Sequence, residues 1–462
     1  LDAGEHQQPQ PLLDLDALNA SEKENWVWKG AQILKAGGYK HALITLSRGG
    51  ADAAVTREYD IAKREFIKDG FFIPEAKGSA AWIDENSIYV ATDFGPGSMT
   101  ASGYPRMVKR WRRGVPLEKA ELVYEGLPTD MSVGAVYDDT EGFERGFVVR
   151  SLAFYRTEKF LVGKDGKLIR LDAPIDSETD VAREWLTVQL RSSWTVESGT
   201  YPPGALLAAR FDDFLAGKRR FEALYLPARN SSLASYAWTR NHLVLNTLED
   251  VKNRLFALTP GGDGWKREEL RGAPEFSAVS FRPVDPEDSD EYFMEAGGFL
   301  APPALYLGRI GELPEKLKEM PAFFDASGLE VGQHFARSKD GTLVPYFQVS
   351  PKNIELDGAN PTLLSGYGGF EISQTPYYSG AVGLGWLAKG GVYVVANIRG
   401  GGEYGPAWHQ AALKSNRHRA YEDFAAVASD LIERKVTSPA RLGCRGGSNG
   451  GLLAGNMLTL YP

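Results

Sequence analysis

Short strand-like runs recur through residues 1–325 and constrain the fold of this half more than any other feature. Val, Tyr, Phe, Trp and Thr are frequent in the runs, and Gly, Pro, Asp and Asn separate them. Residues 82–90 and 238–245 are similar to each other, because each reads as a strand, a polar turn and a second strand. Such units recur roughly every 40–50 residues, the length of a four-stranded propeller blade. The pattern predicts a β-propeller, with a pair of packed β-sheets as the alternative.

The pattern changes after residue 325. Residues 336–349 predict a hairpin around an Asp-Gly turn, and 392–398 are continuously apolar, as in a strand buried on both faces. The other elements we expect are two strands, 362–365 and 441–444, and two helices, 421–434 and 452–460. Alternating strands and helices predict an α/β layer with a parallel sheet.

Two domains are expected, because 462 residues exceed the roughly 250–300 at which a single core stops growing. We predict a propeller at 1–325 and an α/β domain at 326–462. The Pro-containing stretch 313–321 is the expected junction.

The charge balance argues against two classes of partner. With 52 Lys and Arg against 60 Asp and Glu, the net charge is −8, which disfavours nucleic acid and anionic membrane as partners. No run of about 18 apolar residues predicts a membrane span.

The chain has a single cysteine, Cys444, so it can form no intrachain disulfide. Its apolar surroundings in the sequence predict a core residue and not a nucleophile. A lone cysteine fits a reducing compartment, and we expect a cytoplasmic protein. Periplasmic and secreted locations stay open, because the chain starts at Leu1 and not at a methionine.

Residues 446–450, Gly-Gly-Ser-Asn-Gly, fit the pattern G-x-S-x-G between a predicted strand and a predicted helix. A strand that turns sharply into a helix holds the serine in a strained conformation with its hydroxyl exposed. The following helix N-terminus favours developing negative charge. Ser448 is therefore the candidate nucleophile, and a glycine-rich turn with a capping serine is the alternative.

Two more glycine-rich segments follow predicted strands. Residues 366–370, Gly-Tyr-Gly-Gly-Phe, lie where an α/β-hydrolase places its second oxyanion donor, although a tight turn around a packed Tyr367 is also possible. Residues 399–405 lack the endings of phosphate-binding loops. We interpret them as a backbone turn near the mouth of the site, with a direct catalytic role for Arg399 or Glu403 as the alternative.

Together, the segments 365–376, 396–408 and 437–453 resemble the prolyl oligopeptidase family of serine peptidases. The motifs Gly-Tyr-Gly-Gly-Phe, Asn-Ile-Arg-Gly-Gly-Gly-Glu-Tyr-Gly and Gly-Gly-Ser-Asn-Gly-Gly all stand unbroken and in order. The strong match covers roughly 336–462, whereas the β half matches only in organisation. The related oligopeptidase B group tends to have Ala after the nucleophile and lacks the phenylalanine. Asn449 and Phe370 therefore make the chain more similar to the proline-specific branch.

The resemblance implies a β-propeller domain at 1–325, followed by the N-terminal part of an α/β-hydrolase domain at 326–462. It also implies a role for each matching residue. Ser448 would be the nucleophile, the backbone N–H of Asn449 and the hydroxyl of Tyr367 would form the oxyanion hole, and Phe370 would line the pocket for the residue before the cut. The propeller would admit only short peptides, and the full-length protein would be monomeric. The resemblance implies no metal and no organic cofactor.

The chain departs from the family order after the serine. Only 14 residues follow Ser448, and they include neither Asp nor His, whereas the order in α/β-hydrolases is Ser, then Asp or Glu, then His. His409 and His418 precede the serine and are expected to be structural or solvated. We therefore expect that the triad Asp and His are not in this chain. The chain is expected to be a piece that is truncated after the elbow and that lacks the first part of the propeller. This piece alone is expected to be inactive.

The leading hypothesis is a serine oligopeptidase that cuts short peptides after proline through an acyl-enzyme on Ser448. The alternatives are a related peptidase with oligopeptidase B-like or acylaminoacyl peptidase-like specificity, and a non-catalytic propeller interaction module. An intact elbow and an oxyanion tyrosine argue against the interaction module.

Overall fold

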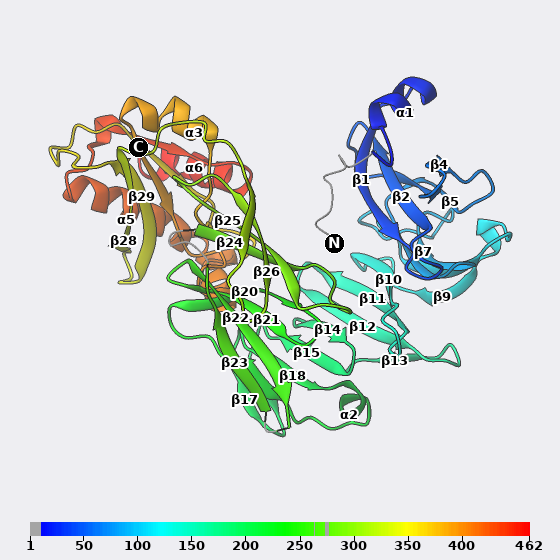
Figure 1. Cartoon of the computed structure of the whole chain (residues 1–462). Helices are drawn as coiled ribbons and strands as arrows, with labels where there is room; N and C mark the ends of the chain where they lie inside the picture. Colours follow the sequence, from blue (N-terminus) through cyan, green and yellow to red (C-terminus); the bar gives the residue numbers. More distant parts are fainter. Residues whose placement is uncertain (1–10, 263, 273–276) are drawn as a thin grey trace. The chain divides into compact units, whose positions relative to one another are not determined.

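The computed structural model describes residues 11–262, 264–272 and 277–462, and the chain forms two compact units, Leu1–Glu184 and Trp185–Pro462. Figure 1 shows the elements of both units, coloured along the chain.

The first unit contains three consecutive antiparallel sheets of adjacent strands. Its elements are α1 (Leu15–Glu22), β1 (Trp26–Ile33), β2 (His41–Arg48), β3 (Ala54–Asp60), β4 (Glu65–Phe66), β5 (Phe72–Ala76), β6 (Ser79–Asp84), β7 (Ser87–Ala91), β8 (Met107–Arg112), η1 (Leu117–Lys119), β9 (Glu121–Glu125), β10 (Ser132–Asp138), β11 (Arg145–Ala153), β12 (Arg156–Val162), β13 (Leu168–Arg170) and β14 (Glu178–Ala182).

The middle sheet, β6–β9, is buried on both faces. Along β7, Ile88 and Val90 pack toward the first sheet, whereas Tyr89 and Ala91 pack toward β10 and β11. Because successive side chains of a strand point to opposite faces, an all-apolar β7 can fill two cores at once. The sheets therefore stack face to face through their side chains.

The second unit begins with three more antiparallel groups of strands, drawn from green to yellow-green in Figure 1. They are β15 (Trp185–Gln189) with β18 (Leu206–Arg210) and β19 (Glu222–Tyr225); β20 (Ser231–Trp238), β21 (Leu243–Glu249), β22 (Lys252–Gly261) and β23 (Gly264–Leu270); and β24 (Ser277–Pro283), β25 (Glu291–Gly298), β26 (Ala304–Arg309) and β27 (Glu315–Glu319). The hairpin β16 (Trp194–Val196)–β17 (Gly199–Tyr201) and helix α2 (Phe211–Leu215) lie between β15 and β19 in the chain.

The expected junction at 313–321 needs correction. Residues 315–319 form β27, which pairs with β26, so most of this stretch belongs to a sheet. The link to the next strand runs through residues 320–328 instead. A domain boundary near 325 stays a prediction.

The rest of the second unit is an α/β layer. Its elements are β28 (Leu329–Arg337), β29 (Leu343–Pro351), β30 (Thr362–Gly366), α3 (Gly380–Gly385), η2 (Leu387–Lys389), β31 (Val392–Ala396), α4 (Gly405–Gln410), η3 (Lys414–Asn416), α5 (His418–Glu433), η4 (Pro439–Arg441), β32 (Leu442–Arg445) and α6 (Asn449–Leu460). The sheet order is β28-β29-β31-β30-β32, and β30 runs parallel to both of its neighbours. The predicted hairpin, parallel sheet and alternation of strands and helices are confirmed.

Strand β31 is buried on both faces, as its continuous apolar run predicts. Val392 and Val394 join the core formed with α5 and α6, and Tyr393 and Val395 join the core formed with α3 on the opposite face. The helices therefore cover both sides of the sheet, which is the usual environment of parallel strands.

The prediction that Cys444 fills the core is wrong, because its side chain is exposed. It lies on β32, which pairs with β30 and forms the edge of the sheet as described. An apolar stretch is buried only where another element covers it, and local sequence does not report that.

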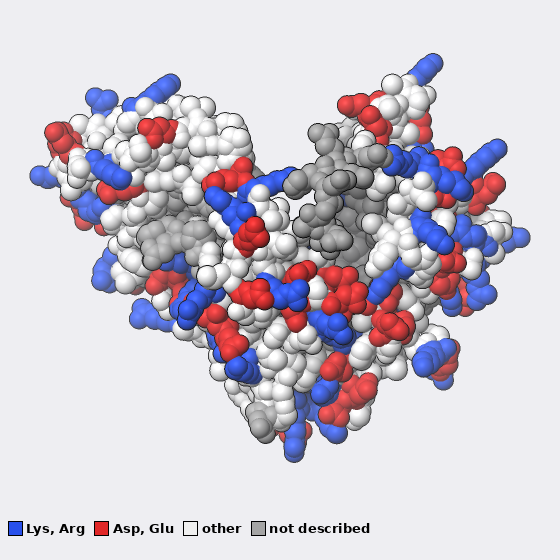
Figure 2. All heavy atoms as spheres, in the orientation of Figure 1, with Lys and Arg blue, Asp and Glu red and all other residues white. Residues whose placement is uncertain are grey.

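Charges of both signs are interspersed over the described residues on the face shown in Figure 2. Within the described part of the chain, no helix is long and apolar enough to cross a membrane.

Candidate active site

Three glycine-rich loops meet at one edge of the α/β sheet. Gly366 at the end of β30 is in register with Ala396 at the end of β31, and Ser365 is in register with Arg445 at the end of β32. Because these strands are parallel, the loops that follow them leave the sheet at the same edge. Open α/β sheets bind their ligands at this carboxyl edge.

Ser448 lies in a sharp turn between β32 and α6. Its backbone has φ 53° and ψ −119°, a region that non-glycine residues rarely adopt, and its side chain is exposed. The glycines explain how the turn closes. A Cβ on Gly446 would lie 1.9 Å from the carbonyl oxygen of Gly450, and one on Gly450 would lie 2.5 Å from that of Gly366. The strand, the strained serine and the helix have the geometry that the motif predicts.

The loop after β30 is attached to this turn. The side-chain amide of Asn449 donates a hydrogen bond to the carbonyl oxygen of Tyr367 at 2.6 Å. The structure thus brings Tyr367 and the Ser448–Asn449 turn together. Asn449 is also the first residue of α6, where backbone N–H groups have no partner within the helix. Such an N–H is suited to bind a developing oxyanion.

Phe370 follows in the same loop with φ 53°, and its side chain is about half exposed. The next residue, Glu371, also has a positive φ of 57°. Two consecutive left-handed non-glycine residues cost free energy that surrounding contacts must supply, and residues of this kind cluster at functional sites.

Arg399 is held in place by two carboxylates. Its buried guanidinium and backbone N–H donate to Asp423, whose side chain is fully buried, and the guanidinium also donates to Asp340. This pairing holds the pKa of Asp340 well below its usual range. Since its donors are engaged within the protein, Arg399 has a structural role, as the turn interpretation of 399–405 expects.

Glu403 is buried in the same loop, and burial raises its pKa to about 7. One carboxylate oxygen accepts hydrogen bonds from the backbone N–H of Gln374 and the side chain of Asn397. With this pKa, the Glu403 carboxyl is protonated, and so uncharged, in a large fraction of molecules at neutral pH. This lowers the cost of burying it completely.

The two histidines near the elbow in the sequence, His409 and His418, are engaged in local contacts. His409 is buried. When its Nδ1 carries the proton, it donates to the carbonyl oxygen of Gly400 at 2.7 Å. In the other tautomer, Nδ1 accepts a hydrogen bond from the backbone N–H of Glu371. His418 is exposed, and its Nδ1 contacts the carbonyl oxygen of Ser415.

Sequence reasoning missed two residues that support the site. Arg417 contacts both the Tyr367 loop and Asn449. Arg191, which follows β15, forms an ion pair with Glu371 beside Phe370. Arg417 is 49 residues from Gly368 and 32 residues from Asn449 in the chain. Arg191 is 180 residues from Glu371, so no local pattern could indicate these contacts.

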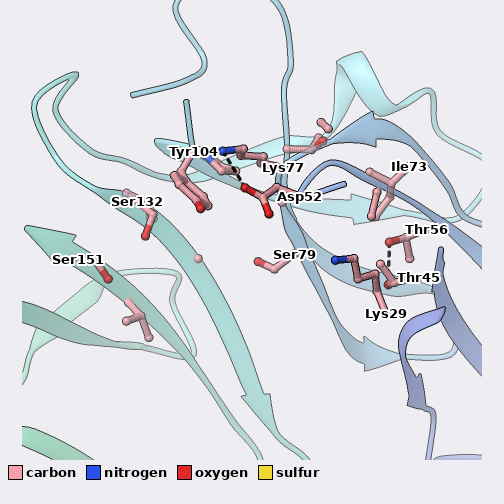
Figure 3. A pocket seen from close by; sticks show the side chains of 18 residues that line it. Lys29, Thr45, Asp52, Thr56, Ile73, Lys77, Ser79, Tyr104, Ser132 and Ser151 are labelled. Atoms are coloured by element: carbon pink, nitrogen blue, oxygen red, sulfur yellow. Dashed lines mark hydrogen bonds and ion pairs between the residues drawn. The ribbon is translucent and has the colours of Figure 1, made fainter. Parts of the chain in front are cut away.

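A separate cavity of about 460 Å³ lies in the first unit among β1–β11 (Figure 3). Seven of its 18 lining residues carry a hydroxyl, and the lining also has two lysines and one aspartate. The amine of Lys29 contacts the carbonyl oxygen of Gly50, and the amine of Lys77 pairs with Asp52 and lies over the ring of Tyr104. Both cations are already engaged, so the cavity lacks a charge that would select a ligand.

No group of three His, Cys, Asp or Glu side chains suited to a metal ion occurs among the described residues. The elbow at Ser448 is therefore the site with a recognisable chemistry. The fold and this site together define an α/β-hydrolase elbow in a chain whose preceding part consists of antiparallel sheets, most of them four-stranded.

Comparisons with known proteins agree. The model for the prolyl oligopeptidase N-terminal β-propeller domain matches residues 2–308, and the model for the prolyl oligopeptidase family matches residues 380–462. The chain belongs to the prolyl oligopeptidase family of serine peptidases. Its fold is a β-propeller domain followed by the start of the hydrolase domain, which confirms the predicted fold class over the alternative of two packed sheets.

Similar proteins include an uncharacterized peptidase of Sinorhizobium fredii, 42% identical over 98% of this chain, and an uncharacterized peptidase of Rickettsia prowazekii, 31% identical over 98%. The chain spans 63% and 64% of the length of these two relatives. A solved structure of a post-proline cleaving enzyme from Rickettsia typhi superposes with a TM-score of 0.91 at 31% identity, and covers 98% of this chain and 67% of that one.

Proposed function

We propose that the whole protein is a serine oligopeptidase that hydrolyses short peptides on the carboxyl side of proline through an acyl-enzyme on Ser448. The observation that carries the proposal is the elbow itself. An exposed serine with φ 53° begins a twelve-residue helix, and the loop of Tyr367 is bonded to the next residue. A protein that only binds partners has no use for a strained, exposed serine at this position.

The roles of the neighbouring residues follow from their positions. The hydroxyl of Ser448 attacks the scissile carbonyl carbon, and the oxygen of that carbonyl becomes an oxyanion. The N–H of Asn449 and the hydroxyl of Tyr367 donate hydrogen bonds to the oxyanion, and Phe370 provides an apolar wall for the proline ring. The base that accepts the serine proton, and the carboxylate that orients this base, lie outside the 462 residues in this proposal.

Specificity for proline is supported by Phe370 and Asn449 and by the post-proline cleaving enzyme that the chain resembles. We test it with the full-length protein and three chromogenic amides that carry Gly-Pro, a basic residue or an acylated alanine before the leaving group. Hydrolysis of the Gly-Pro amide at a kcat/KM at least tenfold above the others is expected. A preference for the basic or the acylated substrate would instead support the oligopeptidase B-like or the acylaminoacyl peptidase-like alternative.

The nucleophile is tested by labelling with a serine-directed fluorophosphonate. Wild type should be labelled and Ser448→Ala should not, whereas Ser415→Ala, an exposed serine whose backbone carbonyl is retained, should behave as wild type. Tyr367→Phe should lower kcat by roughly 10²–10³, the usual effect of losing one oxyanion donor. Equal labelling of Ser448→Ala would remove the elbow from the chemistry and favour a non-catalytic module.

We further propose that the full-length protein is a cytoplasmic monomer that acts on peptides and has neither nucleic acid nor membrane as a partner. A single cysteine supports the cytoplasmic location, and a net charge of −8 disfavours nucleic acid and anionic membrane as partners. Cell fractionation and analytical ultracentrifugation test them, and a protein found in the periplasmic or membrane fraction, or sedimenting as a dimer, would contradict the corresponding part.

A further inference from the structure

The two carbonyl groups that follow each other in the Tyr367 loop each accept a hydrogen bond from a different side chain. The amide nitrogen of Asn449 donates to the carbonyl oxygen of Tyr367 at 2.6 Å, and the guanidinium of Arg417 donates to that of Gly368. Arg417 also donates to the side-chain oxygen of Asn449, at 3.3 Å. One guanidinium therefore contacts both the loop that carries Tyr367 and the turn that carries Ser448.

The contact with Arg417 also determines how the Asn449 amide is oriented. Because the guanidinium has only donors, it must face the amide oxygen, and the amide nitrogen then points to the carbonyl of Tyr367. Without Arg417, the amide loses one of the two hydrogen bonds that hold its orientation, and the carbonyl of Gly368 loses this donor.

The surrounding backbone is built closely around these contacts. A Cβ on Gly369 would lie 2.4 Å from the amide nitrogen of Asn449. A Cβ on Gly400 would lie 2.3 Å from the carbonyl oxygen of Gly368 and 2.9 Å from Nη1 of Arg417. Both glycines thus leave the space that the side chains of Asn449 and Arg417 need for these contacts.

Arg417 is itself held in place. It precedes α5, is partly buried, and its guanidinium lies over the ring of Tyr421, one helical turn further along, at 5.5 Å from the centroid. The loop that it contacts needs support, because the non-glycine residues Phe370 and Glu371 have positive φ angles of 53° and 57°.

We propose that Arg417 is a positioning residue for the acyl-transfer reaction. Its guanidinium clamps the Tyr367 loop to the Ser448–Asn449 turn, and so keeps the Tyr367 hydroxyl and the Asn449 N–H at the distance that one oxyanion requires. The inference rests on the proposed function, since it concerns how that oxyanion hole is assembled. Arg417 acts through Tyr367 and Asn449 and not on the substrate.

The kinetic test uses the full-length protein with Arg417→Met, Arg417→Lys and the control Arg419→Met. Arg419 is near Arg417 in the chain but contacts the carbonyl of Ala411 instead. Because misplacement of a catalytic group by about 1 Å costs up to 10²-fold, Arg417→Met should lower kcat about 10- to 100-fold with KM changed less than threefold. Arg417→Lys retains a donor for one acceptor at a time and should recover part of this loss, and Arg419→Met should keep the wild-type kcat. If Arg417→Met does not fold, an unchanged kcat in Arg417→Lys overturns the proposal.

A double-mutant cycle separates positioning from a general structural role. In a Tyr367→Phe background, Arg417→Met should lower kcat by a clearly smaller factor than in wild type, because the two changes affect the same oxyanion contact. The same factor in both backgrounds would overturn the clamp.

Hydrogen exchange gives a readout that does not depend on activity. Amides of residues 366–371 should exchange at least tenfold faster in Arg417→Met, while those of β28 and β29 should stay as in wild type. Unchanged exchange in 366–371 would overturn the clamp even if the protein is an active peptidase. Conversely, an inactive wild-type protein with the expected exchange would leave the clamp standing and reject the proposed function.

Discussion

Replacing Asp423 by Asn should destabilise the α/β layer far more than replacing Asp340 by Asn, although both carboxylates bind Arg399. Asp423 has a fully buried side chain and accepts from the backbone N–H of Arg399 at 3.0 Å, from Nε at 2.9 Å and from Nη2 at 2.6 Å. Asp340 lies in the turn between β28 and β29, with 39% of its side chain exposed. Asn keeps the volume of Asp, and both variants remove the charge and one acceptor oxygen, so the comparison isolates the effect of burial.

The expected magnitude follows from the burial of the pair. The Arg399 side chain is only 4% exposed, and removing one partner of a buried ion pair leaves an uncompensated charge that costs about 3–5 kcal/mol. Asp340→Asn leaves the contacts with Asp423 intact and removes a partly solvated partner, which should cost about 1 kcal/mol or less.

Hydrogen exchange of the α5 amides in the full-length protein is the appropriate assay, because unfolding of a protein with two domains is not a two-state process. Since each 1.4 kcal/mol is a factor of ten, Asp423→Asn should accelerate exchange in 418–433 by roughly 10²- to 10³-fold or more, and Asp340→Asn by at most about fivefold. Similar acceleration by both variants would refute the reasoning, because it would mean that burial does not set the strength of this network.

Three other outcomes are expected. Gly446→Ala should abolish fluorophosphonate labelling of the full-length protein, because the new Cβ would lie 1.9 Å from the carbonyl oxygen of Gly450. A Cβ on Gly447 would have nothing within 4 Å, so the control Gly447→Ala should retain labelling. Equal labelling of both variants would contradict the packing argument. Because Glu403 binds its proton more tightly when folded, it should make the free energy of opening of the α/β layer fall by about 3 kcal/mol as pH rises from about 4.5 to about 7. Hydrogen exchange of the α5 amides, corrected for the pH dependence of the exchange chemistry, should show this fall in wild type and not in Glu403→Gln, and the same fall in both would contradict it. Residues 1–462 expressed alone should not turn over a Gly-Pro amide that the full-length protein hydrolyses, and comparable turnover abolished by Ser448→Ala would show that an upstream histidine serves as the base.

Several features could be predicted from sequence because their cause is local. The elbow needs glycines on both sides of Ser448 in the chain, so five consecutive residues suffice to indicate it. The buried strand predicted at 392–398, which the structure has at Val392–Ala396, and the Asp-Gly hairpin also follow from contiguous patterns. Helix starts were less certain. Helix α6 begins at Asn449 and not at 452, because the elbow imposes a helix on glycines that have little helical propensity of their own.

Tertiary structure alone decided which distant side chains meet. The sequence places Arg399 in a glycine-rich segment and gives no indication of Arg417, and only the folded sheet brings Asp423 to the first and the carbonyl of Gly368 to the second. It also leaves Cys444 exposed, although its neighbours in the sequence predict burial. Local patterns specify the strand, the turn and the helix at Ser448, because the forces that shape them act between neighbours in the chain. Burial and ion pairing depend on which elements pack together, and that is determined only when the whole layer has formed.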